Sequence, residues 1–301
     1  MSFLLLAAAV AQPDWQLVWA DEFDGASLDR SRWVLAEDCW GGGNEERQCY
    51  TARKANQRVN DGVLEIIAQR EDFTGPAFPR DQRDSVEKAE ATRKKPFTSA
   101  RLSTQGRASW LYGKIQVRAR LPQGQGTWPA IWMLPEDWAY GGWARSGEID
   151  IMEAVNLGEN CETCEGGREN HVLGTIHFGG EPPRNRYISE QTQLPDPTAF
   201  HTYEVEWDKE GMVWRIDGKD YARREPHEWH TLGSDKPGAP FDKPFHLILN
   251  LAIGGHLPEG RNIKSVDASG FPKTMAIDWV RVWQKPSEAA NASAGTKSGG
   301  N

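Results

Sequence analysis

Residues 147–153 read GEIDIME, in which three carboxylates are interleaved with three large apolar residues. Acidic and apolar residues alternate at first, which is the pattern of a half-buried β-strand. Strict alternation would place Glu153 on the opposite face from Glu148, but a β-bulge sets two residues against one on the next strand and restores parity. Met152 is the natural candidate for the extra residue. The stretch therefore predicts a strand with Glu148, Asp150 and Glu153 on one face and its isoleucines in a core.

With such a bulge the two glutamates are effectively four strand positions apart, so their Cα atoms are about 13 Å apart at about 3.3 Å per residue. Side chains that lean together can reduce this to the carboxyl separation of about 5–5.5 Å that double-displacement glycoside hydrolysis requires. The alternative is an ordinary solvated strand face. Three carboxylates in one row repel one another, however, so a strand without a function for them would tend to avoid the row.

Tryptophan is unusually frequent just upstream, in GTWPAIWMLP at residues 126–135 and again at Trp138 and Trp143. Trp128 and Trp132 are four residues apart, so on a strand they share one face, which we expect to be the acidic one. Aromatic planes pack on the C–H faces of sugar rings, and the indole adds one N–H donor. Any single tryptophan can equally be a core residue, but 14 Trp against 6 Tyr is an excess that favours a carbohydrate groove.

The acidic stretch resembles the active-site signature of glycoside hydrolase family 16, in its bulged, laminarinase-type form. Further segments resemble the same family in the same order, and together they cover about residues 14–284. They are DEFDG at 21–25, NEERQCYT at 44–51, residues 113–135 with the core WPAIW, HFGG at 177–180, NLAIGG at 250–255 and IDWVRVW at 277–283. The ordered set is far more specific than the acidic motif alone.

The resemblance implies that Glu148 is the nucleophile and Glu153 the general acid/base of a reaction that retains anomeric configuration. Crowded carboxylates push one another's pKa values apart, so one acid can remain protonated while another is ionised. Asp150 lies between them and could donate a hydrogen bond to Glu148. The family position of His177 implies a contact near the leaving group, although a lone histidine can also be structural.

Eight residues are candidates for sugar contacts by their positions in the family pattern. Arg101 could instead form an ordinary surface ion pair, and position 256 is often Asn in relatives, so the donors of that subsite differ here. The candidates are Asn44, Glu46, Arg101, Trp128, Trp132, Trp143, Asn250 and His256.

No cofactor is expected for catalysis, but many relatives carry a structural calcium ion on the convex side of the molecule. The matching ligands are the carboxylates of Glu22 and Asp278 and the backbone carbonyl of Gly62. Oxygen ligands from distant segments suit calcium. The alternative is an acidic pair that merely lies close together.

The family fold is an all-β, concanavalin-like jelly roll, a sandwich of two curved antiparallel sheets with a substrate cleft on its concave face. The sequence agrees, because strand-like alternation recurs between tight-turn signals and no long stretch has helical periodicity. Many short strands joined by tight turns indicate a sandwich rather than βαβ units. The clearest predicted strands are residues 63–68, 114–121, 202–207, 213–217 and 276–283.

The length would allow two domains, but all-β sandwiches of this size often form one, here over residues 13–285, and the charge balance suits a neutral substrate. The 301 residues are 38% hydrophobic, enough for a sizeable core, and the net charge of −8 disfavours nucleic acid and strongly anionic polysaccharides as partners. We expect no membrane partner and a monomer.

The two ends of the chain differ from this domain. Residues 1–12 resemble the remnant of a secretory signal, because an apolar run ends in small residues and is too short to span a bilayer. A buried N-terminal strand is the alternative, since a basic start is missing. Residues 286–301 read as a disordered tail or linker. These features predict a secreted protein, extracellular or periplasmic.

The four cysteines pair most simply with their neighbours in sequence, as Cys39–Cys49 and Cys161–Cys164. The first pair would brace the loop that carries Asn44. The second pair could instead be half of a zinc site, but no other pair has ligand spacing.

These observations favour an endo-acting β-1,3-glucanase. Mixed-linkage β-1,3-1,4-glucanases have a motif shorter by the Met152 position. Agar or carrageenan hydrolases share the bulged motif but call for a basic groove, which Arg145, Arg168, Arg184 and Arg186 could supply only in part. A non-catalytic glucan-binding protein would usually lack one or both of the two glutamates, and both are present here. A transglycosylase would use the same residues.

Overall fold

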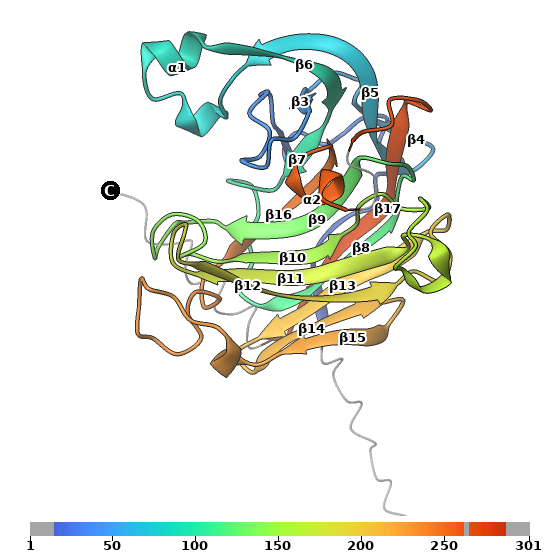
Figure 1. Ribbon diagram of the computed structural model, residues 1–301. Helices are drawn as coiled ribbons and strands as arrows, with labels where there is room; N and C mark the ends of the chain where they lie inside the picture. The colour runs from blue at the N-terminus through green and yellow to red at the C-terminus, as the bar shows by residue number, and fades with distance from the viewer. Residues whose placement is uncertain (1–14, 262–264, 287–301) are drawn as a thin grey trace, which may run out of the picture.

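β-strands dominate the part of the chain that the structure, a computed structural model, describes: residues 15–261 and 265–286. They form two sheets that pack on each other (Figure 1). The ten-stranded sheet contains β1 (Gln16–Asp21), β3 (Gln48–Tyr50), β4 (Gln57–Asn60), β5 (Val63–Pro76), β6 (Thr92–Ser99), β8 (Gly113–Arg120), β13 (His201–Asp208), β14 (Gly211–Ile216), β15 (Lys219–Arg224) and β17 (Lys273–Gln284). The seven-stranded sheet contains β2 (Val34–Leu35), β7 (Arg101–Ser103), β9 (Thr127–Pro135), β10 (Glu148–Glu153), β11 (His171–Gly179), β12 (Asn185–Gln193) and β16 (Phe245–Ile253).

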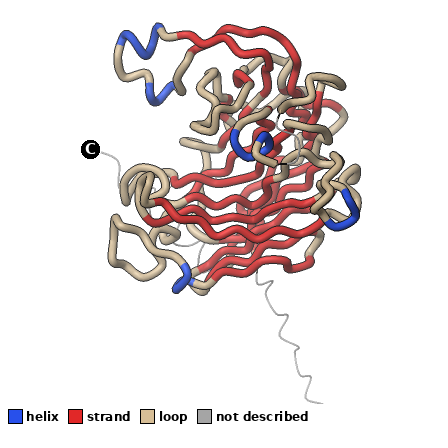
Figure 2. The backbone as a smooth tube through the Cα atoms, in the orientation of Figure 1, coloured by secondary structure: helices blue, strands red, loops and turns tan. Residues whose placement is uncertain are grey.

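Helices are short and lie in the connections between strands, as Figure 2 shows. They are α1 (Val86–Glu90), α2 (His256–Glu259) and the 3-10 turns η1 (Arg80–Gln82), η2 (Glu165–Gly167) and η3 (Pro226–Glu228). Within the described ranges no helix is long and apolar enough to cross a bilayer. The predicted signal remnant and nearly all of the predicted tail lie outside the described residues.

Alternating burial explains why these segments form a sandwich. In β8, Ile115, Val117 and Ala119 are fully buried between half-exposed polar neighbours. The buried faces of both sheets join in one core that also contains Trp33 and Trp207. The predicted all-β sandwich is confirmed, and each of the five predicted strands is found within two or three residues of its expected bounds, except that β5 continues to Pro76.

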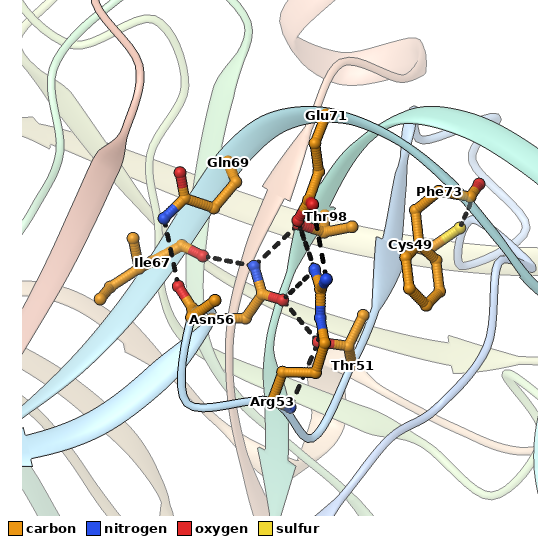
Figure 3. A network of polar contacts seen from close by, with 10 residues as sticks. Cys49, Thr51, Arg53, Asn56, Ile67, Gln69, Glu71, Phe73 and Thr98 are labelled. Carbon is orange, nitrogen blue, oxygen red and sulfur yellow. Dashed lines mark hydrogen bonds and ion pairs between the residues drawn. The ribbon is translucent and has the colours of Figure 1, made fainter.

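The long strand β5 bends where its pairing with β6 shifts register between Arg70 and Phe73, and the two strands arch over one end of the molecule (Figure 1). β6 pairs in parallel with β3, whereas the other ladders are antiparallel. A polar network holds this arch (Figure 3). The buried Asn56 amide donates to the Ile67 carbonyl at 3.0 Å and to the Thr98 hydroxyl at 2.9 Å. It thus fixes the turn before β4 to both β5 and β6.

Candidate active site

The acidic strand β10 is an interior strand of the seven-stranded sheet, third in the order β12-β11-β10-β9-β16-β7-β2. Its ladder with β11 gains one residue between Asp150 and Glu153, so the predicted bulge is present. On the β9 side Met152 pairs with Ile131, which leaves Ile151 as the extra residue. The expectation that Met152 is the extra residue is therefore wrong on that side. Both side chains are buried, so hydrophobicity alone could not distinguish them.

The bulge leaves the three acids on one face of the sheet, which we call the acidic face. Glu148 is opposite His177 on β11, Asp150 is opposite Trp132 on β9, and Glu153 lies further along the same strand. The two glutamates are half-buried, whereas Asp150 is only 3% exposed. The outer acids thus remain accessible from the acidic face, and the middle acid does not.

Each glutamate accepts a hydrogen bond from a different tryptophan. The Trp143 indole Nε1 donates to Glu148 Oε2 at 2.8 Å, and the Trp128 indole Nε1 donates to Glu153 Oε1 at 3.0 Å. A donor aimed at a carboxylate favours its charged form. The two tryptophans therefore hold the glutamates in place and oppose the effect of burial on them.

His177 connects Glu148 with Asp150. Its Nε2 lies 3.5 Å from Glu148 Oε1 and 3.3 Å from Asp150 Oδ2. In the described part of the chain Asp150 and Glu148 form no hydrogen bond with each other. The expected contact of Asp150 with the nucleophile is therefore replaced by a contact of both acids with one imidazole, because the β11 register places His177 directly opposite Glu148.

Burial and mutual charge shift the pKa values of this group strongly. Burial raises the pKa of Glu148, and the positive charge of His177 and the Trp143 donor act against it. Burial and then the charges of the two glutamates raise the pKa of Asp150 well above its usual range. Burial also raises the pKa of Glu153, which the Glu148 charge reinforces and His177 opposes. Such a coupled set can hold a proton on one acid while another is ionised.

His177 is the cation of the group. Burial alone would lower its pKa, but the charge of Glu148, the hydrogen bond and charge of Asp150, and the charge of Glu153 together raise the pKa to about 9. At neutral pH the imidazole is therefore protonated. A positive charge next to Glu148 stabilises the carboxylate form that a nucleophile needs.

A second cluster lies toward β7 on the acidic face. The Arg101 guanidinium carbon lies 4.7 Å from the centre of the Trp132 ring, and the Trp132 indole donates to Asn250 Oδ1 at 2.6 Å. Asn250 pairs with Arg101 across the β16–β7 ladder. The structure thus brings three predicted sugar contacts together. Arg101 stacks on an aromatic ring and, in the described part of the chain, forms no ion pair within 4 Å, contrary to the surface ion-pair alternative.

The loop before β3 extends this cluster. Asn44 Nδ2 donates to Glu46 Oε1 at 3.3 Å, and Gln48 Nε2 donates to Glu46 Oε2 at 2.6 Å. The backbone N–H of His256, the exposed first residue of α2, donates to the Asn44 carbonyl at 2.9 Å. The buried Lys95 ammonium donates to the Glu46 carbonyl, and a pocket of about 390 Å³ lies between this loop and residues 93–96 of β6. The predicted contacts Asn44, Glu46 and His256 are therefore neighbours.

The comparison with known families agrees with this arrangement. A family model described as glycosyl hydrolases family 16 matches residues 44–281, which include the acids, the tryptophans and the loop just described.

The chain belongs to glycosyl hydrolase family 16.

Its family 16 relatives include a beta-glucanase of Rhodothermus marinus, 40% identical over 90% of this chain and 86% of that protein. A glucan endo-1,3-beta-glucosidase of Cryptopygus antarcticus is 39% identical over 93% of this chain and 96% of its own length. Glucan endo-1,3-beta-glucosidase A1 of Niallia circulans is 39% identical, but the chain spans only 38% of its length. The crystal structure of the Rhodothermus marinus laminarinase matches with a TM-score of 0.71 at 38% identity, over 90% of this chain and 97% of that one.

The expected calcium ligands of family 16 fit an ion poorly here. Glu22 accepts two hydrogen bonds from Arg281, at 2.8 and 2.9 Å, and Asp278 accepts one from Arg118. Gly62 lies in the turn between β4 and β5. A calcium ion at the two carboxylates would have to share them with, or displace, two guanidinium groups of like charge. The calcium site is untested, and these two arginine contacts argue against it.

Both predicted disulfides are present, Cys39–Cys49 and Cys161–Cys164. The first joins the segment before the Asn44 loop to β3, as expected. The second closes the loop between β10 and β11, so the zinc alternative for this pair does not hold while the bridge is formed.

One exposed residue of the acidic face is not among the site residues predicted from the sequence. Tyr187 on β12 is 67% exposed and pairs with His177, and the two rings lie 5.8 Å apart. Residues 185–193, NRYISEQTQ, could have indicated it, because in a strand Tyr187 and its neighbour Ile188 point to opposite faces of the sheet.

Proposed function

We propose that the chain is an endo-acting glycoside hydrolase that cleaves β-1,3-glucan with retention of anomeric configuration. The observation that carries this proposal is the pair Glu148 and Glu153 on one face of the bulged strand, each held by its own tryptophan donor. The names of the relatives at 39–40% identity, glucan endo-1,3-beta-glucosidase and beta-glucanase, support the substrate.

In the first step the ionised Glu148 attacks the anomeric carbon while Glu153 gives its proton to the glycosidic oxygen. A bond forms between Glu148 and the sugar, and the bond to the leaving chain breaks. In the second step Glu153 removes a proton from water, and the resulting attack on the anomeric carbon releases Glu148. Charged His177 stabilises Glu148 as a carboxylate before attack and as a leaving group afterwards.

Substrate contacts follow the arrangement of the acidic face. We propose that Trp132 and Arg101 offer a stacking plane and a guanidinium to one sugar, while Asn250 orients Trp132 through its hydrogen bond. Asn44 and Glu46 would bind sugars further along a cleft that crosses the strands.

The decisive experiment measures reducing ends released from laminarin by the wild-type protein, Glu148→Gln and Glu153→Gln. Release that Glu148→Gln abolishes, with the β-anomer first seen by NMR, is the expected result. First release of the α-anomer would contradict retention. Parallel assays on mixed-linkage glucan, agar and carrageenan test the alternatives, and binding without release would favour a glucan-binding protein.

We also propose that the protein acts outside the cytoplasm as a monomer, without a cofactor for catalysis. The two disulfides support the first part, because such bonds persist in oxidising compartments. Fractionation of expressing cells and light scattering would test these points, and a reduced cytosolic form or a dimer would contradict them.

A further inference from the structure

A straight row of side chains crosses three strands from the nucleophile candidate to the edge of the sheet. Glu148 on β10 pairs with His177 on β11, and His177 pairs with Tyr187 on β12. Because β12 is the outermost strand of this sheet, Tyr187 ends the row. Adjacent strands are about 4.8 Å apart, so Tyr187 lies about 9.5 Å from the Glu148 position, across the strands.

Tyr187 belongs to the acidic face rather than to the core face. Its neighbour Ile188 pairs with Ile176 and packs against the core, and side chains of successive strand residues point to opposite faces. At 67% exposure Tyr187 is the most exposed of the large aromatic side chains in the described ranges. An aromatic ring left in water on the same face as the acids is available to a ligand.

The ring also continues an aromatic series. Trp143 lies 5.5 Å from His177, and His177 lies 5.8 Å from Tyr187, with ring planes tilted by 43° and 37°. Trp143 and His177 contact Glu148, so the series starts at the proposed nucleophile and leads away from it. It leads in the direction opposite to Arg101 and Asn250, which lie on β7 and β16 beyond β9.

We propose that Tyr187 is a sugar-binding platform for the part of the substrate that extends beyond His177, on the side of β10 opposite to Arg101 and Asn250. The inference rests on the proposed function, since only a bond cleaved at β10 gives the two sides of the sheet different roles. The ligand is a neutral β-linked pyranose whose C–H face stacks on the phenol ring.

The test compares Tyr187→Ala, which removes the platform, with Tyr187→Phe, which keeps the ring. Leu17→Ala is the matched control, because Leu17 is 49% exposed but lies on β1 in the other sheet. Two substrates are used with each protein. A long β-1,3-gluco-oligosaccharide is long enough to extend past His177 to Tyr187, whereas an aryl laminaribioside, which has only two sugars and one aryl ring, is not.

We expect Tyr187→Ala to lower kcat/KM on the oligosaccharide about tenfold, or about 1.4 kcal/mol, mainly through KM. Its kcat/KM on the aryl substrate should equal that of the wild type, and Tyr187→Phe and Leu17→Ala should match the wild type on both. An unchanged value on the oligosaccharide would overturn the platform. An equal loss on both substrates would also overturn it, because Tyr187 would then act only by supporting His177. If the wild-type protein cleaved neither substrate, both the proposed function and the platform would be overturned. An unchanged value on the oligosaccharide, or an equal loss on both substrates, would overturn only the platform.

Discussion

The two tryptophan donors permit a test that separates the roles of the two glutamates. Trp143→Phe removes the indole N–H that donates to Glu148 at 2.8 Å, and this hydrogen bond lowers the pKa of Glu148. Without it the pKa of Glu148 rises further, so the protein must reach a higher pH before its nucleophile is ionised. The acidic limb of the pH profile of kcat/KM should therefore move to higher pH.

The size of the effect follows from the kind of contact. A hydrogen bond to a charged group contributes about 1.5–3 kcal/mol. On the acidic side of the profile, where Glu148 ionisation limits the rate, kcat/KM should fall about tenfold to a hundredfold at about 1.4 kcal/mol per factor of ten. Loss of sugar stacking by the smaller ring would lower the whole profile without moving its limbs, so the two effects can be separated.

Trp128→Phe is the matched variant, because it removes the donor to Glu153 at 3.0 Å. That bond lowers the pKa of Glu153, so its loss should raise the pKa and move the alkaline limb, not the acidic one, to higher pH. The assay is kcat/KM on laminarin across the pH range for both variants and the wild type. If both variants moved the same limb, or if Trp143→Phe moved only the alkaline one, the assignment of Glu148 as nucleophile and Glu153 as acid would be refuted.

Three further predictions concern stability. Because the pKa of His177 is raised to about 9, its charged form adds about 3 kcal/mol to the free energy of unfolding below about pH 6.5, and this contribution is lost as pH rises through 9. Urea unfolding should show this loss in the wild type and a smaller one in His177→Gln. Equal losses in both proteins would contradict the prediction. Replacing Cys39 and Cys49 by serine should cost about 3 kcal/mol by the loop-closure argument and lower Tm by several degrees, so an unchanged Tm would show that the bridge adds nothing. EDTA should leave Tm unchanged, because Arg281 and Arg118 already neutralise the two expected calcium ligands, and a drop in Tm would establish an ion.

Local periodicity made most of the sandwich predictable. Segments such as residues 114–121 and 202–207 alternate because one face is buried, and the structure places β8 and β13 there. The continuation of β5 to Pro76 was not predictable in this way, because its outer half has no buried stripe and owes its strand conformation to pairing with β6. The polar network around Asn56 supports that pairing, and hydrophobic periodicity in the sequence does not predict such a network (Figure 3).

The acids of the site were predictable because three closely spaced carboxylates in a predicted strand are unusual without a function. The bulge was predictable because strict alternation would otherwise place Glu153 on the opposite face from Glu148. The position of the extra residue was not, since Ile151 and Met152 are both apolar and both buried. The partner of Asp150 was also missed. A contact with Glu148, two residues away, is the nearest option in sequence, whereas His177 reaches Asp150 only through the register of another strand.

Register is the quantity that separates what could be predicted from what could not. β11 and β12 are joined by residues 180–184, and a slip of one residue in their pairing would exchange the faces of every side chain on β12. It would place Ile188 on the acidic face and turn Tyr187 toward the core. The pairing of Ile188 with buried Ile176 opposes that slip, because the exchange would move an apolar side chain into water. The same core contact that stabilises the edge of the sheet therefore also aligns Tyr187 with His177 and Glu148, and no segment of the sequence taken by itself contains that alignment.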